Sequence, residues 1–214
     1  MLLVVYHEEA RIEECLRHHL PFFQTIIVVH DGPCSDATTQ IAKSLGVSCW
    51  ETAEREGYCE PLRGIAQHHA KQAGAEWGAV IDADEKWSPT LLKDLPRLCA
   101  QFDREGTTCA AINRTTIFLP DGSYPTRTED LQARLFKLDA GLFLDLIHTN
   151  VHLLKGRMVK LPDDGAYSIA HINVFKDFDE KSLRYREIAE RQLTQHEPGT
   201  WQHSHLLTVL GETA

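Results

Sequence analysis

The feature that most restricts the fold is an alternation of short apolar segments with segments of helical character. Residues 2–6 (LLVVY), 25–30 (TIIVVH) and 77–81 (WGAVI) are almost continuously apolar, without a polar residue at every second position. Between them, residues 8–20 place apolar side chains at helical spacing, and residues 35–46 have a helix-capping residue at the start and a glycine at the end. Strands that are apolar on both sides belong to a parallel sheet covered by helices. The first half of the chain therefore predicts an α/β fold.

The alternation changes in the second half, where longer strand-like segments follow. The remaining elements that we expect are a strand at 47–51, a helix at 61–75, a helix at 91–102 interrupted or kinked at Pro96, a strand at 107–119, a loop at 121–130, strands at 131–138, 141–154 and 167–175, and a helix at 179–193. We predict one domain over residues 1–195, with halves of about 1–87 and 88–195, and a helical tail over 196–214.

Composition narrows the classes of partner. The chain has 214 residues and a formal net charge of −9, with 31 acidic against 22 basic side chains. Affinity for phosphate backbones needs a basic surface, so nucleic acid is excluded as the main partner. No apolar run is long enough to span a membrane, so we expect membrane contact to be peripheral at most. The six cysteines form no CxxC pair, which favours a reducing, cytoplasmic location.

Three acidic residues directly follow the apolar segment 77–81. Asp82, Asp84 and Glu85 belong to the stretch AVIDADEKW, and they lie where ligands bind beyond the carboxyl ends of parallel strands. Carboxylates one residue apart suit Mg²⁺ or Mn²⁺, with phosphate oxygens as further ligands. In the alternative interpretation, Asp84 or Glu85 caps a helix that begins near Ser88.

A second acidic cluster follows the segment 25–30. Asp31 ends this segment, and Asp36 opens the next helix. Glu8 or Glu9 follows the first strand at the same predicted sheet edge. Asp31 is suited to accept hydrogen bonds from a nucleobase or sugar hydroxyls, although turn formation is an equally simple role. For Asp36, helix capping is the simpler expectation.

The order of these motifs resembles the family two glycosyltransferases of the GT-A fold. The matching stretches are HEEARIEECL, IIVVHDGPCSDATTQIA, LRGIAQHHA and WGAVIDADE. Asp31, Asp36 and Thr38 keep the family spacing, whereas the turn at Pro33 and Cys34 departs from it. The resemblance implies a Rossmann-type three-layer sandwich with a mixed, mostly parallel central sheet.

Two downstream segments resemble a bacterial subgroup of that family. Residues 132–151 and 170–193 are similar to segments of small sugar transferases of the lipopolysaccharide-core type. The resemblance covers most of residues 2–193. It implies synthesis of cell-envelope polysaccharide as the process in which such a protein acts.

The resemblance also implies roles for individual residues. Asp31 would contact the nucleobase, Asp82 the ribose or the metal, and Asp84 a metal ion that bridges the diphosphate. His171 is the candidate third metal ligand, with a buried core histidine as the alternative. The implied nucleotide-sugar contacts are Glu9, Asp31, Arg63, Asp82, Lys181 and Arg184. For Arg63 the alternative is an exposed charge on a helix, and for Lys181 and Arg184 it is contact with an anionic acceptor.

An inverting transfer also needs a base that takes the proton of the acceptor hydroxyl. The TED sequence at 128–130 resembles a family element in which Asp130 is this base, and Glu85 is the rival candidate. We therefore expect a metal-dependent glycosyltransferase that moves a sugar from a nucleoside diphosphate sugar, UDP-linked in most such enzymes, to a saccharide or glycolipid acceptor. The alternatives are a nucleotide-sugar binding protein without catalysis and a HAD-like phosphatase, because DADEK superficially resembles a DxDx motif.

Overall fold

The structure is a computed structural model that describes residues 1–119, 126–174 and 178–212, with side chains described except at 117–119, 126–128, 172–174, 178–181 and 212. Its first part is a parallel sheet in the order β1-β2-β3. The elements of this part are β1 (Leu2–Val5), α1 (Ile12–His19), the short 3-10 helix η1 (Leu20–Phe22), β2 (Ile27–His30), α2 (Thr38–Ser44), β3 (Ser48–Glu51) and α3 (Glu60–Gln72). The predicted alternation of parallel strands and helices is thus confirmed.

The second part is a mixed sheet in the order β4-β7-β6-β11-β5, with β10 also paired to β6. Strands β6 and β7 are antiparallel, whereas β10 and β11 run parallel to β6. A two-stranded ribbon of β8 and β9 lies outside this sheet. The elements of this part are β4 (Trp77–Ala79), β5 (Glu85–Trp87), α4 (Pro89–Glu105), β6 (Thr107–Leu119), β7 (Thr126–Lys137), β8 (Gly141–Leu142), β9 (His152–Leu153), β10 (Arg157–Lys160) and β11 (Ser168–Val174).

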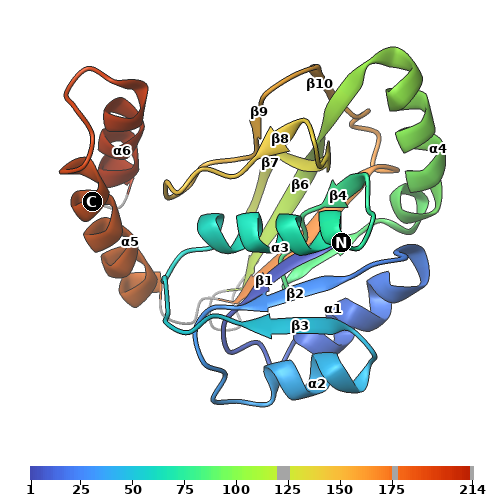
Figure 1. Ribbon diagram of the computed structural model, residues 1–214, viewed down its shortest axis with the longest axis horizontal. Coiled ribbons are helices and arrows are strands. Elements are labelled where there is room, and N and C mark those ends of the chain that lie inside the picture. The colour runs from blue at the N-terminus through green and yellow to red at the C-terminus, as the bar shows by residue number, and fades with distance from the viewer. Residues whose placement is uncertain (120–125, 175–177, 213–214) are drawn as a thin grey trace.

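The two sheets meet where β4 runs beside β1. Leu2 and Val80 form a parallel bridge, and the amide of Ile81 donates to the carbonyl of Leu2 over 3.1 Å. This contact joins the parallel sheet to the mixed sheet, so that strands extend across the molecule (Figure 1). Because β4 ends at this junction, the residues that follow it lie beside the carboxyl end of the first sheet.

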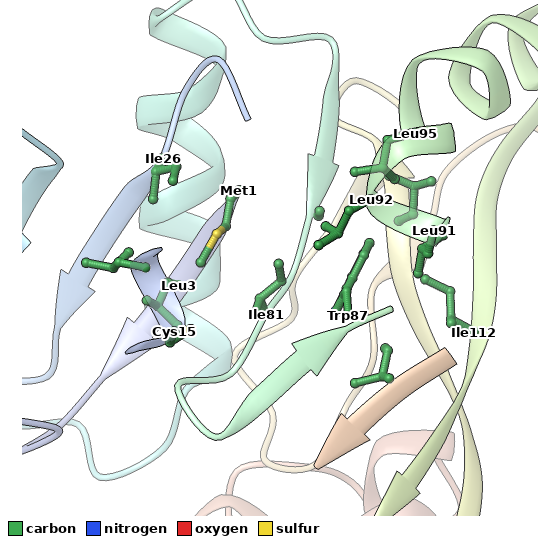
Figure 2. Packing of buried hydrophobic residues seen from close by; sticks show 14 of the residues in the cluster. Met1, Leu3, Cys15, Ile26, Ile81, Trp87, Leu91, Leu92, Leu95 and Ile112 are labelled. Atoms are coloured by element: carbon green, nitrogen blue, oxygen red, sulfur yellow. The ribbon is translucent and has the colours of Figure 1, made fainter. Parts of the chain in front are cut away.

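Alternate side chains of the first sheet enter two separate cores. Leu2, Ile27 and Val29 pack with Leu62 and Ala66 of α3, which Figure 1 shows in front of these strands. Their neighbours Leu3, Val5 and Val28 enter the opposite core, together with side chains of α1 and α4. In this core, Figure 2 shows Trp87 between Ile81 and the leucines Leu91, Leu92 and Leu95. Helices therefore cover both faces, and the predicted three-layer α/β sandwich is confirmed.

The chain ends in two helices, α5 (Phe178–Leu193) and α6 (Trp201–Glu212), which lie side by side at one end of the molecule (Figure 1). Leu206 and Val209 of α6 share a third apolar cluster with Ile188 of α5 and with Leu146 and Ile147. Residues 201–212 of the expected tail thus form a helix that packs on α5. Within the described part of the chain, no helix is both long enough and apolar enough to cross a membrane.

Three expectations about local structure were wrong. Residues 126–130 of the expected loop belong to β7, because they pair with β6 in antiparallel register. The expected strand 141–154 reduces to the two-residue strands β8 and β9, since the segment between them packs against the C-terminal helices instead. Pro96 does not interrupt its helix, because α4 continues through it from Pro89 to Glu105, with Pro96 on the exposed side.

Candidate active site at the carboxyl ends of the strands

The predicted acidic site residues lie shortly after the carboxyl ends of β2 and β4. Asp31 directly follows β2, and its amide donates to the carbonyl of Val5 at the end of β1 over 2.9 Å. Asp82 and Asp84 lie in the turn that joins β4 to β5, and Glu85 is the first residue of β5. Both acidic clusters therefore occupy the sheet edge at which α/β proteins bind ligands.

Asp84 and His171 meet although they are 87 positions apart. Nε2 of His171 lies 3.0 Å from Oδ2 of Asp84, and Nδ1 lies 3.0 Å from the hydroxyl of Thr116. Strand β11 places the histidine, because His171 pairs with Glu85 on one side and with Thr116 on the other. The turn ahead of β5 then brings Asp84 to the same ring.

This pair fits a hard divalent cation. Asp84 supplies a carboxylate oxygen and His171 an imidazole nitrogen whose ring is oriented by a second contact. Mg²⁺ and Mn²⁺ in nucleotide enzymes take one or two carboxylates from the protein and fill other positions with phosphate oxygens. The donor set therefore suits a metal that is shared with a diphosphate.

Asp82 has a different environment from Asp84. One of its oxygens lies 3.0 Å from Arg63 on α3, and the other lies 2.6 Å from Arg134 on β7. Burial acts to raise the pKa of Asp82, but the two arginines outweigh it and hold this pKa well below its usual range. The carboxylate is therefore ionised and already neutralised, and a metal ion would compete with two guanidinium groups for it.

Glu85 is fully buried under two arginines. Its Oε1 lies 2.5 Å from Arg134 and 3.2 Å from Arg114, and its Oε2 accepts the amide of Asp82 over 3.1 Å. Burial raises the pKa of Glu85, although both arginines act against this rise. Since the side chain has no exposed surface, Glu85 organises the turn from within. Neither Asp84 nor Glu85 caps α4, because Ser88 is the N-cap and accepts the amide of Leu91.

Asp130 lies in β7 opposite Arg114 of β6. Arg114 binds both of its oxygens, over 3.0 and 2.8 Å, and Gln132 donates to one of them. Burial acts to raise the pKa of Asp130, but the guanidinium of Arg114 gives a net lowering. The side chain nevertheless keeps 42% of its surface exposed, so its carboxylate is both oriented and accessible.

Asp31 holds the loop that follows β3. Its oxygens accept the amides of Glu56 over 2.6 Å and of Gly57 over 2.9 Å, and the side chain is 5% exposed. In this structure the carboxylate therefore shapes the edge of the site through the backbone. Arg55 extends from the same loop, with its Nε 3.9 Å from Asp31 and its guanidinium over the ring of Tyr6.

Glu9 and Asp36 link the turns that follow β1 and β2. Glu9 accepts the amide of Ala37 over 3.0 Å, and Asp36 accepts the amides of Thr38 and Glu9 over 3.0 and 3.4 Å. Burial opposes the shift, but hydrogen bonds from the hydroxyl and amide of Thr38, the thiol of Cys34 and the amide of Glu9 lower the pKa of Asp36 to about 2. The expectation that Asp36 caps α2 was wrong, because Ala37 is the N-cap residue, and Asp36 accepts the amide of Thr38 from the position before it.

Arg184 and Lys181 both belong to α5, but only Arg184 has a described side chain. The aliphatic part of Arg184 lies against Gly57, whose φ of +83° a side chain rarely adopts. No described residue accepts a hydrogen bond from its buried Nε. The side chain of Lys181 lies outside the described residues, so its predicted contact with the nucleotide sugar stays a prediction.

Two arginines of the site, Arg114 and Arg134, were missed from the sequence. Arg134 has apolar neighbours on both sides in β7, whereas Arg114 lies among polar residues of β6, and each binds acidic side chains that are far away in the sequence. For Arg134, a basic residue between apolar neighbours was the available signal, because a buried cation needs an anionic partner. The identity of those partners follows only from the pairing of β6 with β7.

Comparison with known proteins agrees with this architecture. The chain is similar to S. aureus TarS 1-349 in complex with UDP-GlcNAc (TM-score 0.54, 16% identity, 99% of this chain and 70% of that chain). It is also similar to the UDP complex of TarS 1-349 (0.52, 17%, 99% and 70%) and to a longer TarS chain (0.52, 17%, 99% and 42%). At these identities the likeness establishes the fold alone.

A search of curated proteins finds no match. The family comparison, in contrast, covers most of the chain, because residues 1–164 match the model described as Glycosyl transferase family 2. This match excludes the phosphatase alternative and agrees with the GT-A-like fold. The chain belongs to glycosyl transferase family 2, the enzymes that transfer a sugar from a nucleotide sugar.

Proposed function

We propose that the protein is a metal-dependent, inverting glycosyltransferase that uses a UDP-sugar and a saccharide or glycolipid acceptor. The observation that carries the metal dependence is the meeting of Asp84 with His171 at 3.0 Å, at the sheet edge where the nucleotide of an α/β protein binds. The resemblance of residues 132–151 and 170–193 to lipopolysaccharide-core transferases supports a role in cell-envelope polysaccharide synthesis. We also propose residues 1–195 as the catalytic domain and 196–214 as its tail.

The first sheet is proposed to receive the nucleoside. Asp31 fixes residues 56–57, and Glu9 fixes the start of α2, so both acids shape the wall against which a base and ribose would lie. TarS, which shares this fold, has been solved with UDP-GlcNAc. That complex supports UDP as the first donor nucleotide to test. Arg184, with Nε unsatisfied among the described residues, is proposed to contact the diphosphate.

Asp84 and His171 are proposed to hold Mn²⁺ or Mg²⁺ together with the donor diphosphate. A bound divalent cation supplies positive charge that offsets the negative charge developing on the departing nucleoside diphosphate. Asp82 is proposed to remain with Arg63 and Arg134, so that it fixes the turn carrying Asp84. Arg63 then acts on the donor through this turn.

Asp130 is proposed as the base. Its carboxylate would accept the proton of the acceptor hydroxyl as the oxygen attacks the anomeric carbon from the face opposite the leaving group. Arg114 orients both carboxylate oxygens and keeps them ionised, at the cost of lower basicity. Glu85, which has no exposed surface, is proposed as a positioning residue for Arg114 and Arg134.

The direct test is binding of UDP with Mn²⁺, followed by thermal unfolding. A ligand that binds only the folded state raises the melting temperature, and saturating UDP with Mn²⁺ is expected to do so for the wild-type protein. Asp84→Ala removes a proposed metal ligand and is expected to abolish the shift that depends on Mn²⁺. Asp139→Ala, which removes only an exposed ion pair with Lys155, is expected to keep it.

Turnover then separates catalysis from binding. Slow, Mn²⁺-dependent hydrolysis of a UDP-sugar by the wild-type protein supports a transferase. Stabilisation by UDP-sugars without hydrolysis or transfer to any acceptor would favour the alternative of a nucleotide-sugar binding protein. No stabilisation by UDP, GDP or dTDP with either metal would contradict both proposals.

A further inference from the structure

The turn between β2 and α2 contains a group of donors that the proposed reaction does not use. One ring nitrogen of His30, the sulfur of Cys34 and a carboxylate oxygen of Asp36 all lie within 4.8 Å of one another. His30 ends β2, and the other two residues follow within six positions. We propose that these three side chains form a binding site for Zn²⁺, separate from the pair Asp84 and His171.

The histidine has the protonation pattern of a metal ligand. His30 has no exposed surface, and its Nδ1 lies 2.8 Å from the carbonyl oxygen of Gly32. Its Nε2 lies 3.4 Å from the amide of His7, which can only donate. Nδ1 therefore carries the proton, and Nε2 has the lone pair. Metal-binding histidines commonly donate their other ring nitrogen to a backbone carbonyl in this way.

The contact that a metal ion would replace at His30 is weak. A separation of 3.4 Å is at the long limit for a hydrogen bond between nitrogen atoms. The donating residue, His7, has a φ of +52°, which is uncommon for a residue other than glycine. Strained backbone of this kind concentrates at functional sites.

Cys34 and Asp36 are already in contact. The thiol lies 3.2 Å from Oδ1 of Asp36, and neither side chain is buried. Ligand atoms around tetrahedral zinc are about 3.5 Å apart, as follows from metal–ligand distances of about 2.0–2.3 Å. Two donors therefore have suitable spacing, and the ring nitrogen of His30, which lies within 4.8 Å of both, needs an approach of at most about 1.3 Å. On binding, the thiol would lose its proton to solvent and the thiolate would coordinate the ion.

The chemistry of the donors distinguishes this site from the proposed catalytic one. A set of imidazole, thiolate and carboxylate is typical of zinc, whereas oxygen-rich sites suit Mg²⁺ and Mn²⁺. Three protein ligands leave a fourth position for water or another group. Because Asp36 also accepts the amides of Glu9 and Thr38, an ion here would brace the turns after β1 and β2.

The test uses Co²⁺ as a coloured substitute for Zn²⁺ on the reduced full-length protein. Wild-type protein is expected to bind Co²⁺ with a near-ultraviolet charge-transfer band from sulfur to cobalt, and added Zn²⁺ is expected to remove this band. Cys34→Ser is expected to abolish it. Cys49→Ser, which changes a half-buried thiol on the adjacent β3, is expected to keep it.

Two further variants keep the proposal testable apart from folding and catalysis. Asp36→Asn is expected to weaken Zn²⁺ binding by at least about tenfold, measured by competition with a chromophoric chelator while circular dichroism shows an intact fold. Asp84→Ala is expected to keep the cobalt band even if it abolishes the effect of Mn²⁺. Absence of the band in the wild-type protein, or its survival in Cys34→Ser, would overturn the zinc site and leave the proposed function untouched.

Discussion

The acidic residues of the two sheets are neutralised in different ways. In the β1-β2-β3 sheet, Asp31 and Asp36 accept hydrogen bonds from backbone amides of nearby turns. In the β4-β7-β6-β11-β5 sheet, Asp82, Glu85 and Asp130 are bound by arginine side chains from other strands. The first sheet thus uses its carboxylates to shape loops, and the second concentrates buried charge.

This difference has an energetic consequence. A carboxylate that accepts amide hydrogen bonds depends on local backbone, so each interaction can be disturbed almost alone. Buried ion pairs share partners, so the loss of one cation weakens the neutralisation of several carboxylates at once. The second sheet is therefore expected to respond more strongly to single substitutions. The following predictions test this comparison.

The largest effect is expected at Asp130. Asp130→Asn keeps the shape of the side chain but removes the proposed base, and general-base catalysis contributes about 10²–10⁴-fold to the rate. The kcat of donor transfer or hydrolysis is expected to fall by that order, while UDP binding with Mn²⁺ persists. Glu129→Gln, on the neighbouring position of β7, is the control. A kcat unchanged in Asp130→Asn would remove Asp130 from the mechanism.

Arg134 tests the shared buried charge. Arg134→Met removes the cation that contacts Asp82 at 2.6 Å and Glu85 at 2.5 Å. Removing one partner of a buried ion pair costs about 3–5 kcal/mol, and in Arg134→Met the three carboxylates Asp82, Glu85 and Asp130 would share only Arg63 and Arg114. We expect a decrease of this size in the free energy of unfolding, measured with urea.

The matched control for Arg134 is an exposed ion pair on α1, which packs against the β1-β2-β3 sheet. Arg17 lies 2.8 Å from Glu13, and both side chains are more than half exposed. Arg17→Met is expected to cost about 0.5 kcal/mol or less. Equal costs for the two substitutions would contradict the contrast between the sheets.

The same contrast explains which parts of the protein were predictable from sequence. The strands and helices up to residue 81 follow from local apolar patterns, and the positions of Asp31, Asp82 and Asp84 follow from the rule that parallel strands end at one edge. Arg114 and Arg134 did not follow, because their partners are set by the pairing of β6 and β7. For the same reason, Asp130 was expected in a loop and lies in a strand.

For His171, the family resemblance predicted a role that the local sequence pattern does not indicate. Its sequence neighbours indicate only a strand, and the resemblance suggested a metal ligand. The structure brings it to Asp84, although its role as a ligand stays a prediction. For Glu85, neither the local sequence nor the resemblance predicted its environment. The side chain is completely buried, although its neighbours in the sequence are acidic residues that are usually exposed.

His19 tests how firmly the two sheets are joined. This buried histidine of α1 lies 2.8 Å from the carbonyl of Cys15, and it accepts the amide of Trp87 on β5 over 3.4 Å. Burial lowers the pKa of His19 to about 4. Between this value and the unfolded value of about 6.5, the unfolded chain binds more protons, so stability is lost as the pH falls through this window.

The expected loss is up to about 3 kcal/mol, from about 1.4 kcal/mol for each pKa unit. In His19→Gln, the decrease in unfolding free energy between pH 6.5 and pH 4 should be smaller than in the wild-type protein by about that amount. His68→Gln, which makes the same replacement at an exposed histidine, is the matched control substitution. An unchanged slope in His19→Gln would mean that other groups govern acid stability.

The smallest effect is expected at Ser88, which caps α4 and contacts only neutral groups. Its hydroxyl oxygen accepts the amide of Leu91 over 3.3 Å, and the hydroxyl donates to the carbonyl of Ala166 over 2.5 Å. Loss of a cap and of a neutral hydrogen bond costs about 1 kcal/mol each, so Ser88→Ala should lower the unfolding free energy by about 2 kcal/mol. Ser44→Ala, at the exposed end of α2, should change it by about 0.5 kcal/mol or less. If Ser88→Ala instead costs as much as Arg134→Met, the strong coupling in the second sheet extends beyond its buried charges. The difference between the two sheets would then reflect how tightly each is packed rather than how each neutralises its acids.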